Sequence, residues 1–260
     1  MCLMAWKWQP GSATPLVLIA NRDEFYARPT LPLHWWAKTG EAENGTQILA
    51  GKDLQQGGTW LGVSRNGRLA ALTNYRAPDM QREDAPSRGT LVANFLQSNG
   101  SAADYLQQLL PHTQDYNPFN LLVFDGLALM GLESRRRKVL HLPEGMGALS
   151  NADFQTPWPK LVALQQRLQA QLESASAVDD HPQLLALLHD RTLAPDASLP
   201  ETGVPLALER VLSAIFVAAP GYGTRACSSI RVHQTHIEFF EQSFNASGLT
   251  GSVKEVFAYA

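Results

Sequence analysis

The stretch MCLMAWKWQPGSATPLVLIANRDE, residues 1–24, decides how the chain begins its fold. It contains two apolar runs, residues 2–8 and 15–20, which are separated by a turn-forming segment with a proline and a glycine. Short apolar runs joined in this way are typical of a β-hairpin. The polar residues 21–24 follow the second run directly. We therefore expect polar side chains at the sheet end where Cys2 also lies.

The rest of the chain divides into strand-rich parts and a helical middle. Asn66-Gly67 joins two apolar runs, and Asn-Gly is the preferred pair for a tight hairpin turn. Pro157 and four leucines spaced three and four residues apart predict a helix. The predicted strands are residues 59–64, 68–73, 119–124, 127–132, 139–142, 211–218, 228–232, 237–241 and 253–258. The other predicted helices are residues 88–97 and 102–110, capped by Ser87 and Ser101, and 182–188.

This order of elements indicates the fold class. Strands come first and last, a helical block lies between them, and no strand–helix–strand alternation is sustained, which disfavours a doubly wound parallel sheet. Strands segregated from helices are typical of α+β proteins. The predicted sheets carry apolar surface on both faces. The sequence therefore predicts a four-layer α-β-β-α sandwich of two antiparallel sheets.

Composition excludes several classes of protein. Hydrophobic residues make up 45% of the 260 residues, charged residues make up 17%, and the net charge is −3 without a long block of one sign. This balance fits a globular protein and gives no nucleic-acid surface. The start lacks the features of a secretory signal, and the apolar stretches are too short to span a bilayer. We expect a cytoplasmic protein with no transmembrane segment and no nucleic-acid partner.

Cys2 is the first candidate for chemistry. Removal of Met1 would leave one residue with both a thiol and a free α-amine. The amine titrates near ~7.7–8.0 and the thiol near ~8.5, so the amine could accept the thiol's proton. Such amine-activated nucleophiles perform acyl transfer. With Met1 retained, the nitrogen of Cys2 is part of a peptide bond and cannot act as a base.

Polar residues at strand ends could serve this nucleophile. The candidates are Arg22, Asp23, Asn74, Asn151 and Arg225. Asparagine amides can stabilise a developing oxyanion, and arginines can stabilise a thiolate. Asp23 could hold the α-ammonium group or orient Arg22. The alternative for each residue is a structural hydrogen bond at a turn or strand end.

Histidines give a second hypothesis. The seven histidines show no strong zinc spacing with cysteine or carboxylate, so no metal site is expected. His34 precedes Trp35 and Trp36 on a segment that prolines are expected to make irregular. A histidine with aromatic neighbours could face a flat cofactor such as haem. The alternative is that the two tryptophans close over the core.

Several blocks along the chain resemble the NRDE family, also called the Transport and Golgi Organization 2 family. The blocks are Met1-Cys2, Ala20-Asn21-Arg22-Asp23-Glu24-Phe25-Tyr26 with Arg28-Pro29, Gly57-Gly58-Thr59-Trp60-Leu61-Gly62, Leu69-Ala70-Ala71-Leu72-Thr73-Asn74-Tyr75, Arg88-Gly89, Phe119-Asn120-Leu121, Leu149-Ser150-Asn151, Thr156-Pro157-Trp158 with Lys160, and Pro220-Gly221-Tyr222-Gly223-Thr224-Arg225. Their order implies one NRDE-family domain over residues 1–260. The family resembles the N-terminal-nucleophile hydrolases, which supports the four-layer sandwich.

The resemblance implies roles for the candidate residues. Cys2 matches the nucleophile of the bile-salt hydrolase and penicillin V acylase group. Arg22 and Asp23 resemble that group's arginine and aspartate, although the aspartate spacing is shorter here. Asn74 and Asn151 resemble its oxyanion donors. Arg225 resembles its late arginine.

The resemblance also implies two functions of different class. The family has been linked to secretory-pathway organisation, to lipid or acyl-CoA metabolism and to haem trafficking. The first function is therefore a haem carrier that holds non-covalent haem through His34, Trp35, Trp36 and Tyr222. The alternative is an amide or acyl hydrolase that acts through Cys2. A third is a scaffold that has lost its chemistry. The expected ligand is small and hydrophobic or amide-containing, and haem is one candidate.

Overall fold

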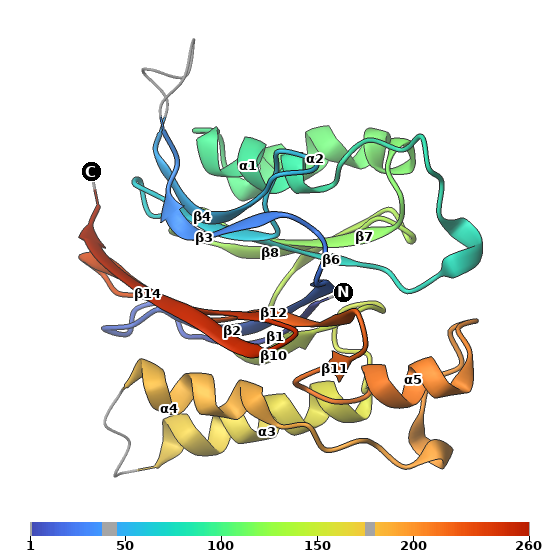
Figure 1. Ribbon diagram of the computed structural model, residues 1–260. Helices are drawn as coiled ribbons and strands as arrows, with labels where there is room; N and C mark the ends of the chain where they lie inside the picture. Colours follow the sequence, from blue (N-terminus) through green and yellow to red (C-terminus); the bar gives the residue numbers. More distant parts are fainter. Residues whose placement is uncertain (1, 38–45, 175–179, 260) are drawn as a thin grey trace.

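The computed structural model describes residues 2–37, 46–174 and 180–259. Two antiparallel sheets pack face to face, and helices cover the outer face of each sheet (Figure 1). The predicted α-β-β-α sandwich is therefore confirmed. No helix in these ranges is long and apolar enough to cross a membrane.

The first sheet, sheet A, carries the N-terminal hairpin at its centre. Its strands run in the spatial order β10 (Gly145–Leu149), β1 (Cys2–Trp8), β2 (Leu16–Phe25), β12 (Tyr222–Val232), β13 (His236–Asn245) and β14 (Gly248–Ala258), and β11 (Ala218–Ala219) pairs with β12. Its outer face is covered by α3 (Pro159–Glu173), α4 (His181–Ala186) and α5 (Leu206–Leu212).

The second sheet, sheet B, runs in sequence order. Its strands are β3 (Thr30–Trp35), β4 (Ile48–Asp53), β5 (Leu61–Ser64), β6 (Leu69–Asn74), β7 (Phe119–Phe124), β8 (Leu129–Glu133) and β9 (Lys138–His141). Its outer face is covered by α1 (Gly89–Gln97) and α2 (Ala102–Leu109). Short 3₁₀ helices span η2 (Pro78–Met80), η3 (Leu110–Asp115), η4 (Leu187–His189) and η5 (Asp196–Ser198).

Burial on both faces explains why β1 is a continuous apolar run. Met4 and Trp6 pack into the cluster between the sheets, whereas Leu3 and Ala5 pack against the helices of sheet A. Side chains alternate between the two faces of a strand, so a strand covered on both sides needs apolar residues throughout. The N-terminal hairpin is therefore buried in the middle of the sandwich.

The strand β2 is longer than the sequence predicts. It continues through residues 21–25, so these polar side chains lie on the strand and do not follow it. Ala20 packs between the sheets and Ile19 packs on the helix side. By alternation, Arg22 faces sheet B and Asp23 faces the helices. The two neighbouring candidates therefore lie on opposite faces of sheet A.

Three segments differ from their predicted structure. The segment expected to be irregular contains β3, which tolerates Pro32 because it is the edge strand of sheet B. The predicted strand 211–218 instead contains the end of α5, a loop and the first residue of β11, and Ile215 and Phe216 of the loop are buried against sheet A. Residues 222–224, directly before Arg225, already belong to β12, so Arg225 lies within a strand. The sequence missed β4, because only its first three residues are apolar.

The two predicted helix caps have different outcomes. The side chain of Ser101 accepts a hydrogen bond from the backbone N–H of Asp104 and caps α2, as predicted. Ser87 does not cap α1. The N-cap residue of α1 is Arg88, which makes no side-chain capping bond.

Candidate functional site

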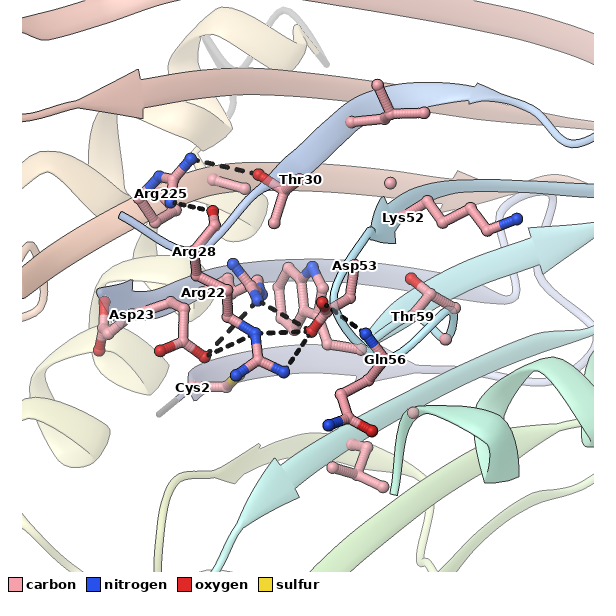
Figure 2. A pocket seen from close by; sticks show the side chains of 18 of the residues that line it. Cys2, Arg22, Asp23, Arg28, Thr30, Lys52, Asp53, Gln56, Thr59 and Arg225 are labelled. Atoms are coloured by element: carbon pink, nitrogen blue, oxygen red, sulfur yellow. Dashed lines mark hydrogen bonds and ion pairs between the residues drawn. The ribbon is translucent and has the colours of Figure 1, made fainter. Parts of the chain in front are cut away.

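A cavity of about 650 Å³ opens where the two sheets end (Figure 2). Strands of both sheets, the segment 82–89 and the β13–β14 hairpin line this cavity. Of the predicted site residues, the cavity is lined by Cys2, Arg22, Asp23, Asn74 and Arg225. The remaining candidates Asn151, His34, Trp35, Trp36 and Tyr222 are not part of its lining.

Cys2 lies at the start of β1, directly opposite Arg22 of β2. Burial raises the pKa of the Cys2 thiol to about 11, because the thiolate loses its hydration; the positive charge of Arg22 only partly opposes this. The thiol is therefore protonated at neutral pH and needs a base to become a nucleophile. Met1, whose removal would supply an amine as that base, lies outside the described residues.

Arg22 belongs to a network of two arginines and two carboxylates. Its Nη2 lies 3.6 Å from Glu24 Oε2 and 3.9 Å from Asp53 Oδ2. Arg28 holds the same Asp53 oxygen through Nε and Nη2, each at 2.7 Å. Figure 2 shows Cys2, Arg22, Arg28 and Asp53 together at one end of the cavity. Because Arg22 makes only long contacts, its guanidinium is the less tightly held of the two.

Asp23 makes its contacts on the other face of the sheet. Its Oδ1 accepts a hydrogen bond from Thr224 Oγ1 at 2.8 Å, and its backbone oxygen accepts one from the Tyr222 hydroxyl at 3.1 Å. The charge of Asp23 also acts on the buried amine of Lys160. Burial lowers the pKa of Lys160 to about 8. Asp23 and Lys160 thus form a pair of ionisable groups on the helix-covered face of sheet A, at the end of the sheet where Cys2 lies.

Asn151 supports Asn74 from outside the cavity. Its Nδ2 donates a hydrogen bond to the backbone oxygen of Asn74 at 2.8 Å. Ser150, the neighbouring residue, contacts the backbone oxygen of Cys2 through Oγ at 3.4 Å. The segment after β10 therefore joins the end of β1 in sheet A to the end of β6 in sheet B. Asn74 faces the cavity, whereas Asn151 lines a smaller one of about 210 Å³.

Arg225 lines the cavity but its guanidinium is occupied by the protein. Nη1 donates to the backbone oxygens of Phe25, Tyr26 and Arg28 at 3.0, 3.2 and 3.0 Å. Nε donates to the backbone oxygen of Phe244 at 3.0 Å. Arg225 therefore fixes the turn between β2 and β3, and its position favours a structural role.

Arg88 is a site residue that the sequence offered only as part of a family motif. It lines the cavity and donates from Nη1 to the backbone oxygen of Pro118 at 3.0 Å, and within the described ranges no carboxylate is paired with it. Burial lowers its pKa to about 10, and the Cys2 thiolate would favour its charged form. Arg88 thus adds a second cation near Cys2.

Two glycines hold Arg88 in place. A Cβ on Gly58 would lie 2.5 Å from the backbone carbon of Gly89, which is too close for any other residue. The backbone N–H of Thr59 donates to the Gly89 oxygen at 3.2 Å. This close backbone contact fixes the start of α1 against the cavity wall. The glycines in two of the motifs quoted above are explained by this packing.

Glu241 was not anticipated as a site residue. It lies in the cavity wall on β13, where it accepts a hydrogen bond from the backbone N–H of Leu33 at 2.8 Å and one from Ser228 Oγ at 3.4 Å. Burial raises the pKa of its carboxyl group to about 7. Alternation along β13 could have placed it on a buried face, but not in a cavity.

The predicted haem contacts do not surround a common space. His34 Nδ1 lies 2.7 Å from the backbone oxygen of Pro32. Trp35 packs edge-on against Phe257, with ring centroids 4.8 Å apart. Trp36 donates from Nε1 to the backbone oxygen of Ala50 at 3.2 Å. Tyr222 is separate from them and bonds to Asp23. Each of these side chains contacts other parts of the protein, and none of the four lines either of the two cavities described above.

Two solved structures share this architecture. A conjugated bile acid hydrolase from Clostridium perfringens has a TM-score of 0.52 with 9% sequence identity, and the match covers 100% of this chain and 97% of that one. An N-acylethanolamine-hydrolyzing acid amidase ortholog from Caenorhabditis elegans has a TM-score of 0.50 with 9% identity, covering 88% of this chain and 92% of that one. At such low identity the likeness shows the fold alone, that of the N-terminal-nucleophile hydrolases.

Sequence comparisons then give the family. The family model described as Transport and Golgi organisation 2 matches residues 1–246. Transport and Golgi organization protein 2 homologs are similar over most of their length: the Bos taurus protein is 36% identical, covering 96% of this chain and 95% of the relative, and the Homo sapiens protein is 34% identical, covering 94% and 93%. The chain belongs to the Transport and Golgi organisation 2 family.

Proposed function

We propose that the chain, once Met1 is removed, hydrolyses the amide bond of a small N-acyl substrate through Cys2. One observation carries the proposal: Cys2 begins the central strand β1 and lines the large cavity directly opposite Arg22. The two structural neighbours are named as hydrolases, and those activities belong to those proteins. They make the proposal concrete but do not decide it.

The proposed reaction has two steps. The Cys2 α-amine accepts the thiol proton, and Sγ attacks the amide carbonyl to form a tetrahedral intermediate. The C–N bond then breaks, and the α-ammonium gives the proton to the leaving amine. Water, deprotonated by the same amine, hydrolyses the thioester and releases a carboxylic acid. A nucleophile and base on one residue follow the logic of amine-activated hydrolases.

The surrounding residues fit particular parts of this reaction. Arg22 and Arg88 place positive charge near Cys2, which favours the thiolate. Asn74 lines the cavity, where its side-chain amide N–H could stabilise the oxyanion. Asn151 would act through Asn74, because it holds that residue's backbone. The cavity volume suits a small organic molecule.

A panel of N-acyl amides tests the proposal. We expect turnover by the wild-type protein and none by Cys2→Ala, in samples whose intact mass shows that Met1 is absent from the wild type. Cys227→Ala is the matched control, because Cys227 is buried against the helices of sheet A and does not line the cavity. Turnover that survives Cys2→Ala would refute the proposal. So would a processed wild type that is inactive on the whole panel.

Haem carriage is the alternative that the family resemblance raised. The four residues predicted to hold haem line neither of the two cavities described above, so haem carriage stays a prediction. A titration of the protein with haem, followed by the Soret band, tests carriage independently of hydrolysis. If carriage is correct, a saturable shift appears and persists in Cys2→Ala. A shift lost in His34→Ala would restore the site predicted from the sequence.

A further inference from the structure

The end of sheet A opposite Cys2 carries a tight hairpin between β12 and β13. The backbone N–H of His233 donates to the His236 oxygen at 2.9 Å, so two residues form the loop and the histidines face each other. Side chains two residues apart lie on one face of a strand, so Glu238 shares a face with His236. The spacing His-x-x-His-x-Glu therefore brings three ligand-type side chains together.

The three side chains lie close together. The two imidazole rings stack with centroids 4.2 Å apart and an interplanar angle of 7°. Glu238 Oε1 lies 3.8 Å from His233 Nε2 and 3.6 Å from His236 Nε2. Among the histidines, cysteines and carboxylates of the described residues, these three form a group whose ligand atoms all lie within 4.8 Å of one another.

The other atoms of these side chains are held by neighbours. His233 Nδ1 lies 3.0 Å from Thr14 Oγ1, and His236 Nδ1 lies 3.1 Å from Thr235 Oγ1. If each Nδ1–H donates to its hydroxyl, the Nε2 lone pair points toward the carboxylate. Glu238 Oε2 is 2.8 Å from His181 Nε2. Hydrogen bonds to the far atoms of ligands orient metal sites in this way.

When both Nε2 atoms are unprotonated, a shared cation would satisfy the three acceptor atoms that face one another. Metal–ligand bonds of about 2.0–2.2 Å allow two donors on one ion to lie up to about 4 Å apart, which accommodates both measured separations. We propose that His233, His236 and Glu238 bind a divalent first-row transition metal such as Zn²⁺, with water at the remaining positions. Two histidines and one carboxylate are an established ligand set for such ions.

Nearby charges make the site selective for strong imidazole binders. Arg231 lies directly across from Glu238 in the β12–β13 register, and the charge of Lys254 also acts on Glu238. Both cations oppose a dication, so the two imidazoles must supply most of the affinity. Hard, oxygen-preferring ions such as Mg²⁺ should therefore bind poorly.

Cys2 pairs with Arg22 of β2, and Val232, the neighbour of His233, pairs with Leu16 of the same strand. These two points on β2 are six residues apart, so the site lies roughly 20 Å from Cys2. It does not depend on the proposed hydrolysis.

Cobalt is the probe that tests the site. Tag-free, chelator-treated full-length protein is titrated with Co²⁺, and the visible absorption bands are recorded. We expect saturation at one equivalent, displacement by Zn²⁺ and tighter binding by Lys254→Ala. His236→Ala and Glu238→Gln should each weaken binding at least 10–100-fold, the range for loss of a supporting residue. Thermal melts without metal check that both variants fold.

The control is a second histidine–carboxylate pair. His112 Nδ1 lies 3.4 Å from Asp115 Oδ2 on the surface, and among the described residues no third ligand joins this pair. His112→Ala should therefore leave binding unchanged. The proposal fails if no saturable equivalent is bound, or if the folded variant His236→Ala binds as the wild type does. It also fails if the bound cobalt shows a thiolate charge-transfer band that Cys2→Ala removes.

Discussion

The two ends of sheet A differ in how they bring polar side chains together. At one end, Cys2 and Arg22 open into a cavity whose walls come from both sheets. At the other end, His233 and His236 lie on a short hairpin with their outer atoms held by hydroxyls. The chain termini marked in Figure 1 show the separation: Cys2 lies beside the N-terminus, whereas His236 pairs with Ala258 near the C-terminus.

The difference shows what a site needs from its surroundings. The Cys2 end has distant parts of the chain meeting across a gap, so its charges are buried and their pKa values are shifted. The hairpin end is local, because three ligands come from six consecutive residues. Burial of charged groups lowers stability but can raise their reactivity. A local cluster costs little stability, and its properties depend mainly on the ligand that binds it. The two ends should therefore be separable by mutation.

Separate loss of the two functions is the largest expected effect. Cys2→Ala should abolish amide turnover and leave Co²⁺ binding unchanged. His236→Ala should weaken Co²⁺ binding and leave turnover unchanged. Both quantities are measured on the same two purified variants. A change in turnover on His236→Ala would show that the ends communicate, and the comparison would then be wrong.

Stability at the cavity end should depend on the ionisation of Glu241. Its pKa is raised from 4.5 to about 7 in the folded protein, so the native state binds the proton more tightly than the unfolded chain does. The contribution of this carboxyl group to the free energy of unfolding therefore falls as pH rises from about 4.5 to about 7. At about 1.4 kcal/mol per pKa unit, the loss is about 3 kcal/mol.

Urea unfolding at pH 5 and pH 8 measures this loss. Glu241→Gln keeps an oxygen for the backbone N–H of Leu33 and cannot ionise. We expect the free energy of unfolding of the variant to rise by about 2.5 kcal/mol relative to the wild type between the two pH values, because part of the loss has already occurred at pH 5. Glu83→Gln, an exposed carboxylate on the cavity rim, should follow the wild type. If the difference in free energy of unfolding between Glu241→Gln and the wild type is the same at both pH values, the pKa of Glu241 is not raised by folding.

Arg22 should matter more for reactivity than for folding. It faces Cys2 and favours the thiolate, and no carboxylate in the described residues holds it closer than 3.6 Å. Arg22→Met should lower kcat/KM about 100-fold, the effect of losing one electrostatic contact in a transition state. The acidic limb of the pH profile should also move to higher pH, because the thiol becomes harder to ionise. Arg65→Met, a cation stacked 3.8 Å over Trp35 and outside the cavity, is the control.

If the acidic limb of the pH profile does not move in Arg22→Met, the role of Arg22 is structural. Loss of its contacts to Glu24 and Asp53 could lower activity through the fold alone. Such a loss would reduce kcat/KM equally at every pH and would lower the melting temperature. The combination of profile and melt therefore separates the two explanations.

The sequence predicted the frame of the sandwich because local signals determine it. Asn66-Gly67 and the apolar runs around it do form the β5–β6 hairpin, and the spaced leucines do lie on α3. The pattern failed where apolar residues are buried without a strand. Ile215 and Phe216 pack on sheet A from a loop, and a run of apolar side chains looks the same in both cases.

The site was predicted only in part, for a related reason. Cys2 and Asn74 could be chosen because they lie at strand ends, and Arg22 because it follows the apolar run of β2, although β2 itself continues to Phe25. Arg225 could not be judged from sequence, because its bonds go to backbone oxygens of distant residues. The sequence predicts no metal site at the histidine hairpin, because His233 and His236 show no strong zinc spacing with cysteine or carboxylate along the chain. A two-residue turn creates a different spacing, in which histidines three apart face each other.

The smallest expected effect tests how the hairpin end is organised. Thr14 lies on the β1–β2 connection and contacts His233 Nδ1 through its hydroxyl. Thr14→Val removes that hydroxyl with little change in shape, so the imidazole can turn away from Glu238. We expect Co²⁺ affinity to fall about tenfold, the lower end of the range for residues that orient a ligand. Thr250→Val, which removes a hydroxyl bonded to the Ser243 oxygen at the cavity end of the sheet, should bind Co²⁺ as the wild type does. Equal affinities in the two variants would mean that the rings are held by their own stacking, and that the hairpin alone orients the site.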